Sequence, residues 1–439
     1  MAPAYVIILL LASIMFIIFT GVKLRWHPFL SLLIAALGFG LLAGLPALEV
    51  VQTIATGFGL LIGAIGLIVV LGSILGTVLE ESGSVAVLGN LLSRKAPGNM
   101  SYGISLLGLV LGIPVFCDSG FIILVSLARS LSVSTGIPFS TMSLSLSSGL
   151  YTTHTLVPPT PGPVAAAGNL QIGDSLGLII LLGLVVSLPV AWIAQQYAKR
   201  IGVLLNVEPH DIKGEKQFND VNLSAPILMI TLPVLLIAVS SLVDLFDVQG
   251  AVVIRFVGNP TVALLITVCL SLMWFRSRGQ SANWIEKGIR QAGPILLLTG
   301  CGGALGAVLK ASPLAHLVTE WAEEQSLSGV AILFAGFAIS ALFKTAQGSS
   351  TGALVIASAL LSPLVVDAGF SDPLQLSLLV LAIGAGAMTV SHANDSYFWV
   401  VSQFSGFDLR SAYRGITIMT LLQGLTAFAS VLILYYVLV

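Results

Sequence analysis

Long apolar runs separated by short polar breaks make up most of this chain. Eight of the runs are long enough, allowing for tilt, to cross a lipid bilayer as helices. They lie near 4–20, 28–45, 59–79, 175–197, 224–243, 260–275, 293–309 and 415–438. The pattern predicts a chain that spans a membrane several times.

Glycine, proline and polar clusters interrupt two further regions, 101–170 and 329–404. Irregular backbone is tolerated at membrane depth only where protein or a water-filled cavity surrounds it. We therefore expect one re-entrant hairpin and one broken helix in each region. The hairpins are 101–131, with its tip near Asp118, and 329–362, with its tip near Gln347; the broken helices are 136–170, unwound near His154, and 373–404, unwound near His392.

One pattern occurs twice along the chain. Gly72 and Gly76 match Gly302 and Gly306 at a constant offset of 230 residues. A polar break and then a histidine-containing break follow each copy in the same order. Duplicated apolar segments that are interrupted at matching places are typical of the central site of a secondary transporter.

The duplication defines the expected fold. We predict an all-α polytopic membrane protein with two inverted repeats and with broken helices at the site. Each repeat would hold five transmembrane spans and one re-entrant hairpin. The first repeat covers 1–198, a hydrophilic cytoplasmic linker covers 199–222, and the second repeat covers 223–439. An odd number of spans turns the second repeat upside down relative to the first.

The positive charges predict the orientation, because cytoplasmic loops are enriched in Lys and Arg. With the N-terminus outside, 15 of the 18 basic residues fall inside, Arg255 and Lys310 fall outside, and Lys344 lies at a hairpin tip. The inside residues are Lys23, Arg25, Arg94, Lys95, Arg129, Lys199, Arg200, Lys213, Lys216, Arg276, Arg278, Lys287, Arg290, Arg410 and Arg414.

Composition indicates that lipid is the solvent of this chain. Hydrophobic residues make up 56% of the 439 residues and charged residues 8%, which is too little polar surface for a soluble globule. The first apolar run lacks a basic leading segment and a clear cleavage site, so we interpret it as a retained span. The net charge of −1 provides no basic face for nucleic acid, and the three cysteines predict no disulfide framework.

Asp118 lies at a flexible break between two apolar arms. A carboxylate at membrane depth is costly unless it is paired, protonated or hydrated. One interpretation is a residue that carries a coupled proton. The other is an N-cap for the following helix, a position that Asp favours, and one residue can serve both roles.

Lys344 is the basic residue expected deep in the second half, and hydroxyl and amide side chains follow it at 345–351. Its ammonium could pair with an anionic substrate or with a carboxylate such as Asp118, or it could snorkel to the surface. The polar cluster suits a ligand with several hydroxyl groups, because each buried polar group needs a partner. A simple hairpin turn is the alternative.

Histidines occupy comparable breaks in the two halves, at His154 and His392. Each could bind a ligand, accept a proton near neutral pH, or be a satisfied structural group. The prolines within 158–163 keep the first break open, because they cannot continue a regular helix. In the second break Asn394 adds an amide, and Asp395 adds an acid that would act at the site or cap the next helix.

Four stretches resemble the gluconate permease family of proton symporters, within a broader ion transporter superfamily. They are Val115–Phe121, His154–Pro163, Lys344–Thr351 and Ser391–Val400. The resemblance implies proton-driven uptake of a small hydroxylated monocarboxylate, such as gluconate, a related sugar acid, glycerate or D-serine, across a bacterial inner membrane. It also implies a homodimer in which a transport part moves against a scaffold part as an elevator.

We therefore expect a secondary active transporter rather than an enzyme, with no cofactor and no metal. Its partners would be the anionic or zwitterionic substrate, protons and membrane lipid. Lys344 and exposed helix ends would hold the carboxylate. The expected substrate-binding residues are Ser119, Thr153, His154, Thr155, Lys344, Thr345, Gln347, Ser349, Ser350, Thr351, Ser391, His392 and Asn394. The expected proton-coupling residues are Asp118, His154, His392 and Asp395.

Three alternatives remain open from the sequence. Unwound carbonyl groups also suit Na⁺, so sodium coupling is one of them. An intramembrane hydrolase could use Asp118 and Asp395 as an acid pair or a histidine-based metal site, but the sequence contains no His-Glu-x-x-His and no Gly-x-Gly-Asp at either acid. A passive channel is the third, although polar breaks that enter from opposite faces suit alternating access better.

The distribution of basic residues makes a prediction about topology. Single cysteines at Lys95 and Lys310, in a background without the three native cysteines, should react with an impermeant thiol reagent from opposite sides of the membrane. Labelling of both positions from the same side would contradict the inverted repeats.

Overall fold

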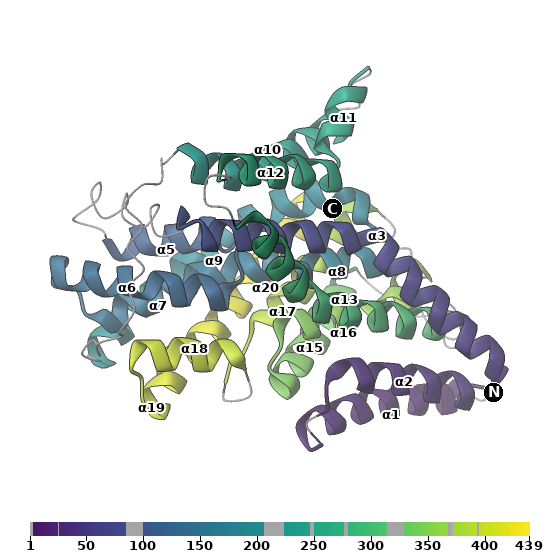
Figure 1. Ribbon diagram of the computed structural model, residues 1–439. Helices are drawn as coiled ribbons and strands as arrows, with labels where there is room; N and C mark the ends of the chain where they lie inside the picture. The colour runs from purple at the N-terminus through teal and green to yellow at the C-terminus, as the bar shows by residue number, and fades with distance from the viewer. Residues whose placement is uncertain are drawn as a thin grey trace.

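The structure is a computed structural model that describes residues 3–24, 26–84, 100–205, 224–245, 250–275, 280–313, 329–367, 370, 372–392 and 395–439. Within these ranges the regular elements are helical (Figure 1). The first half contains α1 (Pro3–Val22), α2 (Pro28–Leu42), α3 (Ala47–Glu81), α5 (Met100–Leu111), α6 (Cys117–Thr135), α7 (Phe139–Leu156), α8 (Pro161–Asn169) and α9 (Leu176–Leu205). The second half contains α10 (Ser224–Leu245), α11 (Val252–Gly258), α12 (Pro260–Trp274), α13 (Ser281–Ala311), α15 (Gly329–Gln347), α16 (Ser350–Asp367), α17 (Pro373–Met388), α18 (Ser396–Ser405), α19 (Leu409–Ala412) and α20 (Ile418–Leu438).

Several of these helices are suited to a lipid bilayer. Among the described residues, five helices are long and apolar enough to cross a membrane, and the pair α11–α12, bent by 66°, would add a sixth span. Shorter apolar helices, including α5, α16 and α17, lie beside them. The expectation of an all-α protein with several membrane helices is confirmed.

Local sequence explains where many helices begin. Proline is the first residue of α2, α8, α12 and α17, a position where its missing N–H and fixed φ cost nothing. Asn259 and Asp372 cap α12 and α17 by accepting a hydrogen bond from the backbone N–H two residues later.

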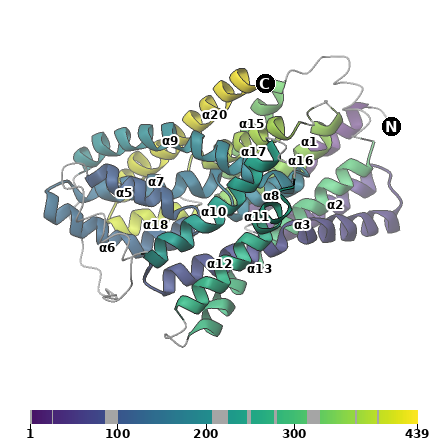
Figure 2. The ribbon, with the colours of Figure 1, turned by 90° about the horizontal axis from the view of Figure 1, so that it is seen from above.

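Helices α3 and α13 form a tightly packed antiparallel pair. A Cβ atom at Gly57, early in α3, would lie 2.5 Å from the Cβ of Ala307, late in α13. A Cβ atom at Gly288, early in α13, would lie 2.6 Å from the Cα of Ile74, late in α3. Glycine at these positions therefore lets the two backbones approach closely. Figure 2 shows α3, α12 and α13 on one side of the molecule, α9 and α20 on the other, and α8, α16 and α17 between them.

The expected interruptions exist, with shifted boundaries. The first hairpin-like pair turns at 112–116, so Asp118 lies in the first turn of α6 rather than at the tip. The second turns at Gly348, whose φ of +74° favours glycine, and Ser349. His154 lies in the last helical turn of α7, because unwinding begins at Val157, and a residue that precedes proline is disfavoured in helical conformation. His392 lies within the break between α17 and α18, as expected.

Two helices extend well beyond the predicted apolar runs. The sequence suggested spans near 59–79 and 293–309, whereas α3 begins at Ala47 and α13 begins at Ser281. Both extensions carry polar residues, such as Glu49 and Gln52 in α3, that lower the local hydropathy without interrupting the helix. The apolar runs read from the sequence therefore missed the first residues of both helices, although the window Ala47–Ala64 of α3 is itself apolar enough to cross a membrane.

The hairpin arms contact the broken helices through glycine. Gly108 of α5 and Gly149 of α7 face each other, and a Cβ atom at Gly149 would lie 2.1 Å from the carbonyl oxygen of Ser105. In the second half a Cβ atom at Gly386 of α17 would lie 2.2 Å from the carbonyl oxygen of Phe337 in α15. In both halves, the first helix of the hairpin-like pair therefore packs against the broken helix with the two backbones in direct contact.

This contact predicts a large effect of one methyl group. Gly149→Ala should lower the thermal unfolding temperature in detergent, because overpacking of this kind costs about 1–3 kcal/mol or more. Gly38→Ala on α2 is the matched control, since a Cβ atom there would meet nothing within 4 Å, and it should leave the unfolding temperature unchanged or raised. Equal unfolding temperatures for the two variants would refute the close α5–α7 contact.

Candidate functional site

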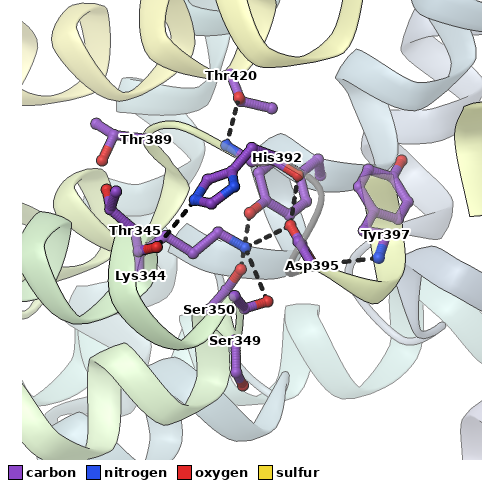
Figure 3. A network of polar contacts seen from close by, with 12 residues as sticks. Lys344, Thr345, Ser349, Ser350, Thr389, His392, Asp395, Tyr397 and Thr420 are labelled. Carbon is purple, nitrogen blue, oxygen red and sulfur yellow. Dashed lines mark hydrogen bonds and ion pairs between the residues drawn. The ribbon is translucent and has the colours of Figure 1, made fainter. Parts of the chain in front are cut away.

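A buried ion pair joins the two interrupted elements of the second half (Figure 3). Lys344, in the last turn of α15, is fully buried, and its Nζ lies 2.5 Å from Oδ2 of Asp395. Asp395 is 3% exposed and immediately precedes α18. The lysine therefore does not snorkel, and its partner is Asp395 rather than Asp118, the carboxylate suggested from the sequence.

Asp395 combines the two roles that the sequence left open. Its Oδ1 accepts a hydrogen bond of 3.1 Å from the backbone N–H of Tyr397, so the carboxylate caps α18. Its Oδ2 faces Lys344 and also accepts a hydrogen bond from the hydroxyl of Ser391. The carboxylate is thus stabilised by a cation, a helix N-terminus and a hydroxyl group at once.

Aromatic side chains from both halves lie beside the ion pair. The Nζ of Lys344 lies 5.6 Å from the centre of the Tyr151 ring, within cation–π range. Tyr151 stacks on Tyr397 with ring centres 4.9 Å apart, and its hydroxyl lies 2.7 Å from Oγ of Ser350. Tyr397 donates a hydrogen bond to the carbonyl of Ser147. Helices α7, α16 and α18 therefore share one polar core, in which charges interact strongly because water is excluded.

Backbone contacts fix the break between α17 and α18. The N–H of Ser391 donates to the hydroxyl of Thr420, and the hydroxyl of Thr417 donates to the carbonyl of Ser391. Thr417 ends a π-helical turn, Tyr413–Thr417, which precedes α20. The Nε2 of His392 lies 2.9 Å from the carbonyl oxygen of Thr345, so this nitrogen carries the hydrogen and donates it. His392 thereby ties the break to the end of α15.

Two titratable groups of the first half lie close to the break of the second half. Asp118 accepts a hydrogen bond from the side chain of Ser396, the residue after Asp395, while its Oδ1 is buried without a hydrogen-bond partner among the described residues. His154 is 8% exposed, and its Nδ1 also lacks such a partner within the same described part of the chain. Its ring lies near Phe116 and lines a cavity of about 10 Å³, room for about one water molecule.

Other predicted residues have different surroundings. The hydroxyl of Thr153 donates to the carbonyl of Leu109, and that of Thr155 donates within α7, so both serve helix contacts. Ser349 accepts the N–H of Gly352 at the start of α16. Near the second turn, Thr345 is exposed and Thr351 is partly buried. Three of the predicted substrate-binding side chains lie outside the part of the chain that the structure describes. They are those of Ser119, Gln347 and Asn394.

The sequence reasoning missed three members of this site, Tyr151, Tyr397 and Ser396. The sequence carried a signal for Tyr151, because the segment around it, which forms α7, is dense in Ser and Thr. In the structure every residue of α7 is buried. Buried hydroxyl groups need partners, and Gln423 of α20 supplies one by donating to the carbonyl of Ser148 and to Oγ1 of Thr152. A Ser- and Thr-rich membrane helix is thus a sign of a polar core.

The fold and the site define the class of protein. Apolar helices interrupted around a buried ion pair describe a multi-pass membrane transporter rather than an enzyme. The chain belongs to the GntP permease family, since the model of that family, described as GntP family permease, matches residues 5–437.

Named relatives cover nearly the whole chain. An uncharacterized permease of Haemophilus influenzae is 32% identical over 92% of this chain and 86% of the relative. The gluconate permease of Zymomonas mobilis is 30% identical over 95% of both chains. The D-serine transporter DsdX of Escherichia coli is 29% identical over 99% of both chains.

The fold has a counterpart among solved structures. The YdaH transporter of Alcanivorax borkumensis superimposes with a TM-score of 0.67, covering 94% of this chain and 99% of that one. Its sequence identity of 16% limits the likeness to the fold.

The ion pair makes a prediction about stability. Lys344→Gln or Asp395→Asn alone leaves a buried charge without its partner and should destabilise the protein by about 3–5 kcal/mol, whereas the double variant should recover much of the loss. Thermal unfolding in detergent measures this. Lys287→Gln is the control, because it breaks an exposed pair with Glu81 and should cost about 0–1 kcal/mol. A double variant no more stable than either single variant would contradict the pairing.

Proposed function

We propose that this protein takes up gluconate or a related small hydroxylated monocarboxylate, such as another sugar acid, glycerate or D-serine, together with protons across the bacterial inner membrane. The single observation that carries the proposal is the buried pair of Lys344 and Asp395 at the junction of α15 and α18. The names of the relatives, which include gluconate permeases and a D-serine transporter, support the substrate class.

The proposed binding step is an exchange of carboxylates at Lys344. The substrate carboxylate takes the place of Asp395 beside the ammonium, and the hydroxyl groups around the second turn bind the substrate hydroxyls. Asp395 then sits beside a second negative charge in a site that screens charge weakly, so it binds a proton. One anion and one proton enter together, and the net charge of the site stays unchanged.

The first half supplies a route for the proton. Asp118 reaches Ser396, next to Asp395, and has a free buried oxygen within the described residues. His154 lines the adjacent small cavity with an unpartnered Nδ1. We assign Asp118 and His154 to proton transfer and leave Thr153 and Thr155 out of the substrate site.

Alternating access follows from the proposed architecture. The same order of long helix, hairpin-like pair, broken helix and long helix occurs in both halves, and the antiparallel α3–α13 pair supports inverted repeats. We propose two repeats, 1–198 and 223–439, hairpins that enter from opposite faces, and an N-terminus outside. A homodimer with an elevator movement completes the proposal.

Transport by reconstituted vesicles tests this function. An inward proton gradient should drive gluconate accumulation in wild-type vesicles, and a sodium gradient alone should not. Asp395→Asn should keep substrate exchange and lose accumulation, because asparagine still caps α18 but cannot carry the proton. Asp118→Asn should slow proton-driven accumulation more than exchange, and Lys344→Gln should abolish binding.

One control variant and one binding measurement complete the test. Asp372→Asn changes the capping residue of α17, on the exposed surface, and should leave accumulation intact. Gluconate should raise the unfolding temperature of Asp395→Asn more than that of wild type, since the substrate carboxylate replaces the missing counter-charge of Lys344. Accumulation driven by sodium alone, or normal proton-driven accumulation by Asp395→Asn, would overturn the proposed coupling.

A further inference from the structure

A second, much larger cavity lies away from the ion pair. Its volume is about 750 Å³, and its walls come from α3, the end of α8, the start of α12, the end of α13 and α16. Polar side chains at membrane depth require water or protein partners, so polar residues in the wall favour a hydrated cavity over one filled by lipid. The polar wall residues are Asn169, Gln171, Asp174, Asn259, Thr261, Lys310 and Ser362.

The wall segments belong to the same side of the membrane under the orientation that the basic residues predict. With the N-terminus outside, α3 and α12 begin at the outer surface, and α8 and α13 end there. The cavity is lined by the middle of α3 from Gly57 to Ile68, the first residues of α12, and the last residues of α8 and α13. Lys310, one of the two basic residues expected in outer loops, stands in its wall.

Three helices lead from this cavity to the ion-pair site. On α3, Ile68 lines the large cavity and the next residue, Val69, lines the small cavity beside His154. On α8, Asn169 lines the large cavity and Pro161 the small one. The third helix, α16, begins with Ser350, which contacts Tyr151 at the site, and reaches the large cavity with Ser362.

An apolar contact separates the two cavities. Ile68 and Val69 are 5% and 2% exposed, and the residues of α8 between its ends, Val164 to Ala167, are fully buried. Asn169 ties α8 to α16, because its Nδ2 donates to the carbonyl of Val355 and to Oγ of Ser358 at 3.0 and 2.8 Å. Helices α8 and α16 are therefore joined, and opening the contact requires both to move relative to α3.

We infer that the large cavity is the outer vestibule through which the substrate reaches Lys344, and that the contact of α3 with α8 at Ile68 and Val69 closes it in this structure. The occupant is a hydrated hydroxylated monocarboxylate, a substrate class that rests on the proposed function. The position of the vestibule rests on the cavity and on the orientation that the basic residues predict.

Cysteine accessibility tests the vestibule in the full-length protein. In a background without native cysteines, Leu60→Cys and Ala64→Cys place thiols in the cavity wall, and Leu67→Cys is the matched control. Leu60 and Leu67 lie on the same helix and are 71% and 63% exposed, but Leu67 is not part of the wall. The probe is an anionic, membrane-impermeant methanethiosulfonate added from outside. Because only the thiolate reacts, the cavity positions should react about 10-fold or more faster than Leu67→Cys.

Each outcome decides the inference. Fast reaction of Leu60→Cys and Ala64→Cys from outside, with loss of uptake after modification, supports the vestibule. Reaction no faster than at Leu67→Cys would mean that lipid fills the cavity, and reaction from inside only would mean that it opens to the other face; either result overturns the inference. Labelling is measured without substrate. Fast labelling, together with a wild-type protein that takes up none of the proposed monocarboxylates, would leave the vestibule standing and refute the proposed function.

Discussion

The structure depends on one interaction, the buried ion pair between Lys344 and Asp395. Removing two charges from water is costly, and a buried pair is often less stable than apolar residues of the same size. The lysine could have reached the surface by snorkelling, yet it is fully buried. A stability argument alone therefore does not account for the pair. Its location, where the end of one helix meets the start of another, requires both helices to stop at membrane depth and requires an aromatic and hydroxyl-lined enclosure around them.

The duplicated glycines explain how the interrupted elements are held. In α3, Gly72 and Gly76 face the carbonyl oxygens of Pro159 and Pro114, which belong to the first break and the first turn. In α13, Gly302 faces Val355 and Gly306 faces the carbonyl oxygen of Ala359, both in α16. The motif that repeats after 230 residues is thus a smooth helix face in each half, against which the elements around the site pack. Small side chains are needed there because unwound backbone must find protein rather than lipid beside it.

Much of this arrangement could be predicted from the sequence, because its signals are local. Prolines mark the break after α7, glycine marks the turn before α16, and an ionisable residue in an apolar run marks Lys344 as a candidate site residue. The pairing could not be predicted in this way. The sequence suggested Asp118 as the carboxylate partner, whereas Lys344 meets Asp395, 51 residues away, through the three-dimensional approach of α15 to α18. Thr153 belonged to a polar cluster in the sequence. In the structure its hydroxyl points toward Leu109, and this orientation is known only once the contact of α5 with α7 is seen.

The two halves share an order of elements but differ in the polar residues that they bring to the site. The residue that precedes α8 is Thr160, whose hydroxyl donates to the carbonyl of Val157, whereas the residue that precedes α18 is the acid Asp395. With a neutral threonine before α8, the cation and its counter-ion come from the second half, while the first half contributes Asp118, His154 and the Tyr151 ring. In the proposed function, an anion exchanges with Asp395 at Lys344 only if a proton neutralises the displaced carboxylate, so we propose that this asymmetry favours joint movement of anion and proton.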